Sequence, residues 1–308
     1  MMAAPAKEEK ERVCVTGAGG FVGSWIVKLL LSSDYLVHGT VRNPQMLIVF
    51  ILQLINAGDS KYAHLSKLEK ASENLKLFKA DLLDYNSLCS AVAGCSGIFH
   101  VASPVELIEP AVKGTLNVLS ACLEAKVKRV VVVSSISAVF VSPDWPKGQV
   151  KDETCWSAPE YMKATKKWYF LSKTLAEREA LEFGKRTGLE IITVLPSLNL
   201  GPILQPTMNA SSWFLAKVLK RGFESIGYNY WTVVDVRDVA EAVLHDLVDN
   251  YVRVAYPNYN YPHNLSHTDE EEKNVSSDKL QRLGWSYRPL EETLVDSIEG
   301  YRKASVLD

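Results

Sequence analysis

The feature that most constrains this chain is a glycine-rich turn between a short apolar strand and a helix. The segment reads VCVTGAGGFVG over residues 13–23 and contains Gly17, Gly20 and Gly23. The first glycine permits a tight turn, the second a close backbone approach to a pyrophosphate, and the third close packing of helix on strand. The helix N-terminus then offers unpaired N–H groups to phosphates. In this setting the motif predicts a dinucleotide site.

Strand and helix patterns alternate after this motif. Strands that are apolar on both faces suit a parallel sheet covered by helices on each side. We therefore expect a Rossmann-type doubly wound α/β sheet in residues 1–198, with 228–248 packing back on it. The proline-rich and aromatic-rich remainder, most of 199–308, predicts a smaller, truncated and irregular substrate lobe. The expected strands are 13–16, 35–41, 75–79, 97–101, 129–134 and 189–195, and the expected helices are 21–31, 85–92, 111–125 and 168–183.

Composition excludes several classes of partner. The formal net charge of −2 gives no basic field for nucleic acid. Residues 1–12 lack the apolar run of a signal peptide. The apolar run Met46–Ile55 is shorter than the roughly 20 residues that a bilayer requires. The 5 cysteines have no metal-binding spacing, which favours reduced thiols in a cytoplasmic protein without a metal. A small-molecule substrate is the expected partner, and the sequence leaves the oligomeric state open.

The end of the second expected strand indicates which dinucleotide binds. Enzymes that use NAD place a carboxylate about 20 residues after the glycine motif, where it binds the ribose 2′-hydroxyl. Here the strand ends HGTVRNP, without an acidic residue, and Arg42 stands at this place. An arginine suits a 2′-phosphate, so the sequence predicts NADP(H).

Tyr169 and Lys173 form a Y-x-x-x-K pattern on an expected helix. Their spacing puts both side chains on one face of that helix. A nearby ammonium lowers the pKa of a phenol, so Tyr169 could donate a proton to a substrate oxygen. Ser134 and Ser135 end the Val-rich strand, at the carboxyl edge where ligands of such sheets bind. A hydroxyl there can hold the substrate oxygen beside the tyrosine.

Together these motifs resemble the extended short-chain dehydrogenases/reductases, and more closely the plant cinnamoyl-CoA reductase and dihydroflavonol reductase group. The resemblance covers most of residues 12–215 and continues to the C-terminus. Matching segments include GTVRNP, KADLLDYNSL, GCSGIFHVASPV, EPAVKGTLNVL, KRVVVVSSISAV and GPILQPTMNASS. The phrase LQPTMNAS is more similar to the cinnamoyl-CoA reductases.

The resemblance implies Ser135, rather than Ser134, as the third catalytic residue beside Tyr169 and Lys173. It implies Lys61 as a second partner of the 2′-phosphate. The adenine would lie beside 81–82, and the nicotinamide near Pro196 and Ser211. The cofactor-binding residues expected in full are Thr16, Gly17, Gly20, Phe21, Gly23, Arg42, Lys61, Asp81, Leu82, Ala102, Ser103, Tyr169, Lys173, Pro196 and Ser211.

The chain departs from the family pattern in blocks. Gln45–Ala57 is an insertion between the two expected phosphate ligands, a loop is shortened after Val105, and much of a strand–helix unit is missing after Val243. The family motif NWYCYGK reads KWYFLSK over Lys167–Lys173.

The expected activity is NADPH-dependent reduction of a carbonyl or CoA thioester. Hydroxycinnamoyl-CoA, giving an aldehyde and free CoA, is the first substrate expected, and a dihydroflavonol or another ketone or aldehyde is the second. A catalytically impaired NADP-binding protein is the alternative from another class, and an unstable product without function is the third.

Overall fold

A computed structural model describes residues 10–42, 61–103, 108–146, 148–221, 232–245, 253–255 and 275–307. Its centre is a parallel seven-stranded sheet in the order β3-β2-β1-β4-β5-β6-β9. The order reverses between β1 and β4, and ligands of such sheets bind at the carboxyl ends of the strands at this switch point. The predicted Rossmann-type fold is confirmed. The strands are β1 (Arg12–Thr16), β2 (Leu36–Val41), β3 (Leu75–Lys79), β4 (Gly97–His100), β5 (Arg129–Val133), β6 (Glu190–Leu195) and β9 (Arg253–Ala255).

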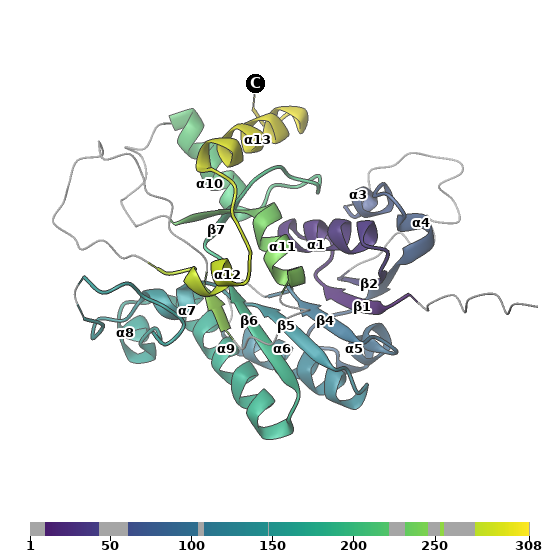
Figure 1. Cartoon of the computed structure of the whole chain (residues 1–308), viewed down its shortest axis with the longest axis horizontal. Coiled ribbons are helices and arrows are strands. Elements are labelled where there is room, and N and C mark those ends of the chain that lie inside the picture. The colour runs from purple at the N-terminus through teal and green to yellow at the C-terminus, as the bar shows by residue number, and fades with distance from the viewer. Residues whose placement is uncertain are drawn as a thin grey trace, which may run out of the picture.

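Helices cover both faces of the sheet because the strands are apolar on both sides. On β1, Val13 and Val15 join one core cluster while Cys14 joins another. Helices α1 (Phe21–Ser32) and α11 (Val236–His245) cover the first face, and they lie above the sheet in Figure 1. The second face, below the sheet in Figure 1, carries α5 (Tyr85–Val92), α6 (Ile108–Glu124) and α9 (Trp168–Thr187).

Short helices connect these elements. Two of them, α3 (Ala63–Ser66) and α4 (Ala71–Asn74), lie between β2 and β3, and α7 (Ser137–Phe140) and α8 (Pro159–Ala164) lie between β5 and α9. None of these four was predicted. Helices of 4 to 6 residues are too short to show the periodic apolar pattern on which such a prediction depends.

The C-terminal third is more regular than its composition suggested. Strands β7 (Leu198–Leu200) and β8 (Val233–Asp235) pair in parallel. They share a core with α10 (Ala210–Arg221) and α13 (Leu290–Lys303), in which Tyr301 is fully buried. A shorter helix, α12 (Asp278–Arg282), precedes α13. The expectation of an irregular lobe is therefore wrong for the described residues, because an apolar face on each helix is buried against the strand pair.

The segment after Val243, where the sequence predicted that much of a strand–helix unit is missing, contains one short described strand. This strand, β9, pairs in parallel with Thr193–Leu195 of β6 and extends the sheet. Three backbone pairs are enough to form this edge strand, and a strand of that length shows no alternating pattern in the sequence.

Several predicted features lie outside the described residues. They are the insertion at 45–57 with its apolar run, residues 104–107 at the shortened loop, and the proline-rich and aromatic-rich residues 256–262. Within the part that is described, no helix is both long and apolar enough to cross a membrane. The division of the chain near residue 198 stays a prediction.

Candidate active site

The glycine turn has the backbone geometry that a phosphate-binding loop needs. Gly17 has a φ of +69°, a conformation that L side chains rarely adopt. A Cβ at Gly23 would lie 2.3 Å from the carbonyl oxygen of Gly17, so only glycine allows α1 to pack this closely. Helix α1 begins at Phe21 without a side-chain cap. Its first N–H groups are therefore available to an anion.

Two basic residues flank this loop. On one side the hydroxyl oxygen of Thr40 accepts a hydrogen bond from the Gly17 N–H at 3.1 Å, and Arg42 follows two residues later. On the other side the ring of Tyr62 packs directly on Gly19, since a Cβ added there would lie 2.3 Å from Tyr62 Cδ1. Lys61 Nζ lies 5.8 Å from the centre of that ring. Arg42 and Lys61 are therefore both next to the glycine loop.

Thr16 and Phe21 have side chains that point into the core. The Thr16 hydroxyl oxygen accepts hydrogen bonds from the N–H groups of Val101 and Ala102, both at 3.1 Å. Its own proton is then directed to His100 Nδ1, 2.9 Å away. Thr16 is fully buried and Phe21 is 7% exposed, so Thr16 offers a ligand no surface and Phe21 offers little.

The residues predicted to lie beside the adenine follow β3, and two further predicted cofactor-binding residues follow β4. Asp81 Oδ1 accepts a hydrogen bond from the Leu83 N–H at 2.9 Å, which fixes the turn after β3. Leu82 packs on α6, where a Cβ at Gly114 would lie 2.8 Å from Leu82 Cβ. After β4, Ala102 contacts the glycine loop, since a Cβ at Gly17 would lie 3.1 Å from Ala102 Cα. Ser103 follows and is partly exposed.

Ser135, Tyr169 and Lys173 come together at the carboxyl edge of β5. The Tyr169 and Ser135 hydroxyls are near enough to interact, and Ser135 Oγ also donates a hydrogen bond to Ser137 Oγ at 3.0 Å. Lys173 Nζ donates a hydrogen bond to the carbonyl oxygen of Val133 at 3.2 Å. The tyrosine side of the cluster is open, because Tyr169 is 40% exposed, whereas Ser135 and Lys173 are each 8% exposed.

Burial dominates the electrostatics of this cluster. It lowers the pKa of Lys173 to about 8, while the charge of Glu177 acts in the opposite direction. The pKa of Tyr169 is raised above its usual value, not lowered as the sequence predicted, because desolvation by burial outweighs the interaction with Ser135. At neutral pH Tyr169 is therefore a phenol that can donate a proton, and Lys173 is mostly an ammonium.

The two serines at the end of β5 have different partners. Ser134 Oγ donates a hydrogen bond to Glu177 Oε2 at 2.6 Å, whereas Ser135 Oγ donates one to Ser137 Oγ at 3.0 Å and lies near Tyr169. Glu177 and His100 were missed by the sequence reasoning. The signal for Glu177 was its position four residues after Lys173, and the signal for His100 was its position at the end of an apolar strand.

Pro196 and Ser211 lie at the junction between β6 and the C-terminal lobe. The Pro196 carbonyl accepts a hydrogen bond from the Ile136 N–H at 3.1 Å. Ser211 Oγ donates to the carbonyl of Asn199 and accepts a hydrogen bond from Asn209 Nδ2 at 2.6 Å. Beside them, Ser197 Oγ and Asn199 Oδ1 are buried polar atoms that have no hydrogen-bond partner among the described residues.

Comparisons with known proteins agree with this geometry. The sequence model of the NAD dependent epimerase/dehydratase family matches residues 13–260. Cinnamoyl-CoA reductase 1 of Petunia hybrida is 40% identical over 320 residues, covering 94% of this chain and 92% of that protein. Tetraketide alpha-pyrone reductase 1 of Arabidopsis thaliana is 36% identical, covering 94% and 95%. The crystal structure of vestitone reductase from alfalfa superposes with a TM-score of 0.81 at 31% identity, covering 97% of this chain and all of that chain.

Proposed function

This chain belongs to the NAD dependent epimerase/dehydratase family and is similar to plant cinnamoyl-CoA reductases, and from that premise we propose that it reduces an aromatic carbonyl substrate with NADPH. It is an oxidoreductase. The observation that carries the proposal is the contact between Tyr169 and Ser135, with Lys173 beside them, at the carboxyl edge of β5.

The described residues fit NADP(H). The uncapped start of α1 and the left-handed Gly17 provide a cradle for the pyrophosphate. Arg42 and Lys61 supply positive charge on both sides of the loop, which favours a 2′-phosphate over a free ribose hydroxyl. At the other end, the unpartnered Ser197 Oγ and Asn199 Oδ1 suit a polar carboxamide. When bound, NADPH supplies the hydride that reduces the carbonyl carbon.

The side chains of the cluster take complementary roles in the proposed reaction. Ser135 holds the substrate oxygen by a hydrogen bond and aligns it with Tyr169. Tyr169 donates its phenolic proton to that oxygen as negative charge develops on it. The Lys173 ammonium stabilises the phenolate that remains. Its buried position keeps it from water, so its charge acts more strongly on the tyrosine.

A hydroxycinnamoyl-CoA thioester is the first substrate proposed. The support is the likeness to cinnamoyl-CoA reductases along almost the whole chain. Reduction of the thioester would release CoA and give the aldehyde. A ketone is the second candidate, since the motif before Lys173 reads KWYFLSK and two similar proteins are named tetraketide alpha-pyrone reductase and vestitone reductase.

The test is NADPH consumption by the purified protein with feruloyl-CoA, beside a Tyr169→Phe variant. We expect turnover by the wild type and a loss of about 10²–10⁴-fold in the variant, the usual contribution of a general acid. Thermal stability should be retained, and NADPH should still bind. NADPH binding without turnover on feruloyl-CoA or on a ketone such as a dihydroflavonol would instead support the alternative of a non-catalytic NADP-binding protein.

We further propose a cytoplasmic location. The five cysteines, all within the described residues, are free thiols, as expected where thiols are kept reduced. Imaging of a fluorescent fusion of the full chain would test this.

A further inference from the structure

Glu177 is a buried carboxylate to which the reaction scheme gives no role. It lies on α9, one turn beyond Lys173, and is 1% exposed. Ser134 Oγ donates a hydrogen bond to its Oε2 at 2.6 Å, and Thr193 Oγ1 donates one to its Oε1 at 3.0 Å. Burying a charge is unfavourable unless the charge is paired and hydrogen-bonded. Two hydroxyl donors and a neighbouring ammonium provide that pairing here.

Three side chains on one face of α9 lie against three consecutive residues at the end of β5, an arrangement that we call the Tyr169 ladder. Tyr169, Lys173 and Glu177 are spaced by four residues, so they line the same face of α9. Their partners are consecutive on the other side. Tyr169 lies near Ser135, Glu177 accepts a hydrogen bond from Ser134, and Lys173 donates one to the carbonyl of Val133.

We propose that Glu177 is a positioning residue that keeps Lys173 in its ammonium form behind Tyr169, without itself touching substrate or cofactor. This inference rests on the proposed function, since it assigns Glu177 a part in the same reaction. Its physical basis is the buried setting, where an unpaired ammonium is costly and a nearby carboxylate compensates it.

Among the described residues, the other groups packed around Lys173 and Glu177 do not supply a negative charge to the Lys173 ammonium. From β4, His100 is the titratable neighbour, and burial lowers its pKa to about 3, so it is neutral at pH 7. Strands β5 and β6 contribute the hydroxyls of Ser134 and Thr193. Helix α7 has no titratable side chain. From α6, Thr115 lies against His100, and the charged residues of that helix (Glu109, Lys113 and Glu124) are exposed.

The first experiment compares pH profiles of turnover. In the wild type, activity should fall as pH rises through the pKa of Lys173, because the ammonium is lost. Glu177→Gln keeps the size and hydrogen-bonding capacity of the side chain but removes its charge. We expect this basic limb to move to lower pH by about one unit or more, as for loss of an opposite charge within a few ångströms.

Thr193→Val is the matched control. It removes one hydrogen bond to Glu177 and leaves the carboxylate charge, so stability should fall while the basic limb stays in place. A purely structural role for Glu177 would lower activity equally at all pH values without moving the limb. That result in Glu177→Gln overturns the proposal.

A second readout does not need turnover. NMR titration of protein labelled at lysine Cε, with Lys173→Arg to assign the signal, reports the protonation midpoint of Lys173 directly. We expect a lower midpoint in Glu177→Gln, and a smaller decrease in Glu177→Asp, where the charge is retained but retracted. If Glu177→Gln does not fold, the protonation midpoint of Lys173 in Glu177→Asp tests the proposal instead. An unchanged midpoint overturns the inference, whereas a lowered midpoint in a protein without turnover rejects only the proposed function.

Discussion

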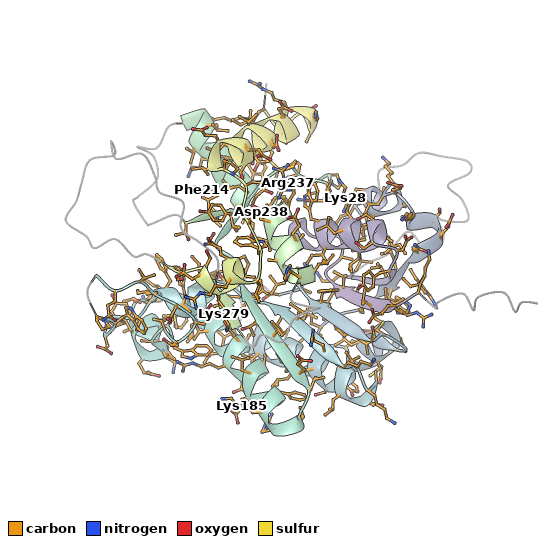
Figure 2. All side chains as sticks on the ribbon, in the orientation of Figure 1. Lys28, Lys185, Phe214, Arg237, Asp238 and Lys279 are labelled. Atoms are coloured by element: carbon orange, nitrogen blue, oxygen red, sulfur yellow. The ribbon has the colours of Figure 1, made fainter. Side chains whose placement is uncertain are left out.

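The catalytic edge and the junction between α11 and α13 are built in opposite ways. At the catalytic edge, hydroxyl groups, the buried Lys173 and the buried Glu177 are held by elements of the central sheet and α9. At the junction, arginines and carboxylates from distant parts of the chain meet; Figure 2 labels Arg237 and Asp238 at the start of α11, below α13. The first arrangement positions a reaction, and the second joins the C-terminal helix to the rest of the molecule.

Arg237 is the centre of the junction. Its guanidinium lies 2.7 Å from Asp235 Oδ2 on β8 and 2.6 Å from Asp296 Oδ2 on α13. Asp235 is fully buried. Nearby, Arg288 contacts Asp238 and Glu241 of α11. Bidentate arginine–carboxylate contacts of this kind fix orientation as well as distance.

This difference predicts which property, stability or catalysis, each substitution should change. Loss of the charge pairs that hold a lobe in place should affect folding and substrate affinity. It should not affect the chemical step, because the Tyr169 ladder stays intact. Substitutions of Ser135 or Tyr169 should affect the chemical step with little change in stability. The following predictions test this separation.

Arg237→Met should have the largest effect on stability. It leaves Asp235 buried without its cationic partner, which typically costs about 3–5 kcal/mol. Thermal or chemical denaturation measures this loss. The control is Lys163→Met, which breaks the Lys163–Glu160 pair, where both side chains are more than half exposed, and should cost at most about 1 kcal/mol. Equal effects of the two substitutions would contradict the importance of the junction.

Ser135→Ala and Ser134→Ala should separate an effect on the chemical step from an effect on stability. Ser135→Ala removes the donor proposed to hold the substrate oxygen, so kcat should fall by about 10²–10³-fold with little change in melting temperature. Ser134→Ala removes a donor to the buried Glu177 and should cost about 1–3 kcal/mol of stability while leaving the Tyr169–Ser135 contact. Steady-state kinetics and calorimetry on both variants give the answer, and the reverse ranking in kcat would assign the catalytic role to Ser134.

His64→Gln should have the smallest effect, and only in acid. Burial lowers the pKa of His64, whose Nε2 lies 2.9 Å from Ser24 Oγ on α1, to about 4. Because the folded-state pKa lies below the unfolded value of about 6.5, the unfolded state binds more protons in this window, and stability is lost as pH falls from about 6.5 to 4.

The variant should lose less stability over that window, by about 1–3 kcal/mol. Urea denaturation at pH 7 and pH 4.5 measures the difference. An identical pH dependence in wild type and variant would show that His64 does not titrate in this way.

The N-terminal two thirds of the fold could be predicted because its signals are local. The strand–turn–helix glycine motif and the apolar strands of a parallel sheet depend on residues close in sequence, and the observed bounds of β1, β3 and α5 lie within one residue of those expected. The spacing of Tyr169 and Lys173 likewise needs only a helix. The short helices and three-residue strands could not be predicted, since they contain too few residues to show a period.

The sequence alone determined the type of sheet, the place of the glycine loop and the face shared by Tyr169 and Lys173, because backbone conformation and helical spacing are set locally. Only the tertiary structure decided that Glu177 stands between Ser134 and Thr193 and that Arg237 joins β8 to α13. These contacts join residues far apart in sequence. Their existence depends on the packing of α9 on β5 and of α13 on β8, which no local pattern specifies.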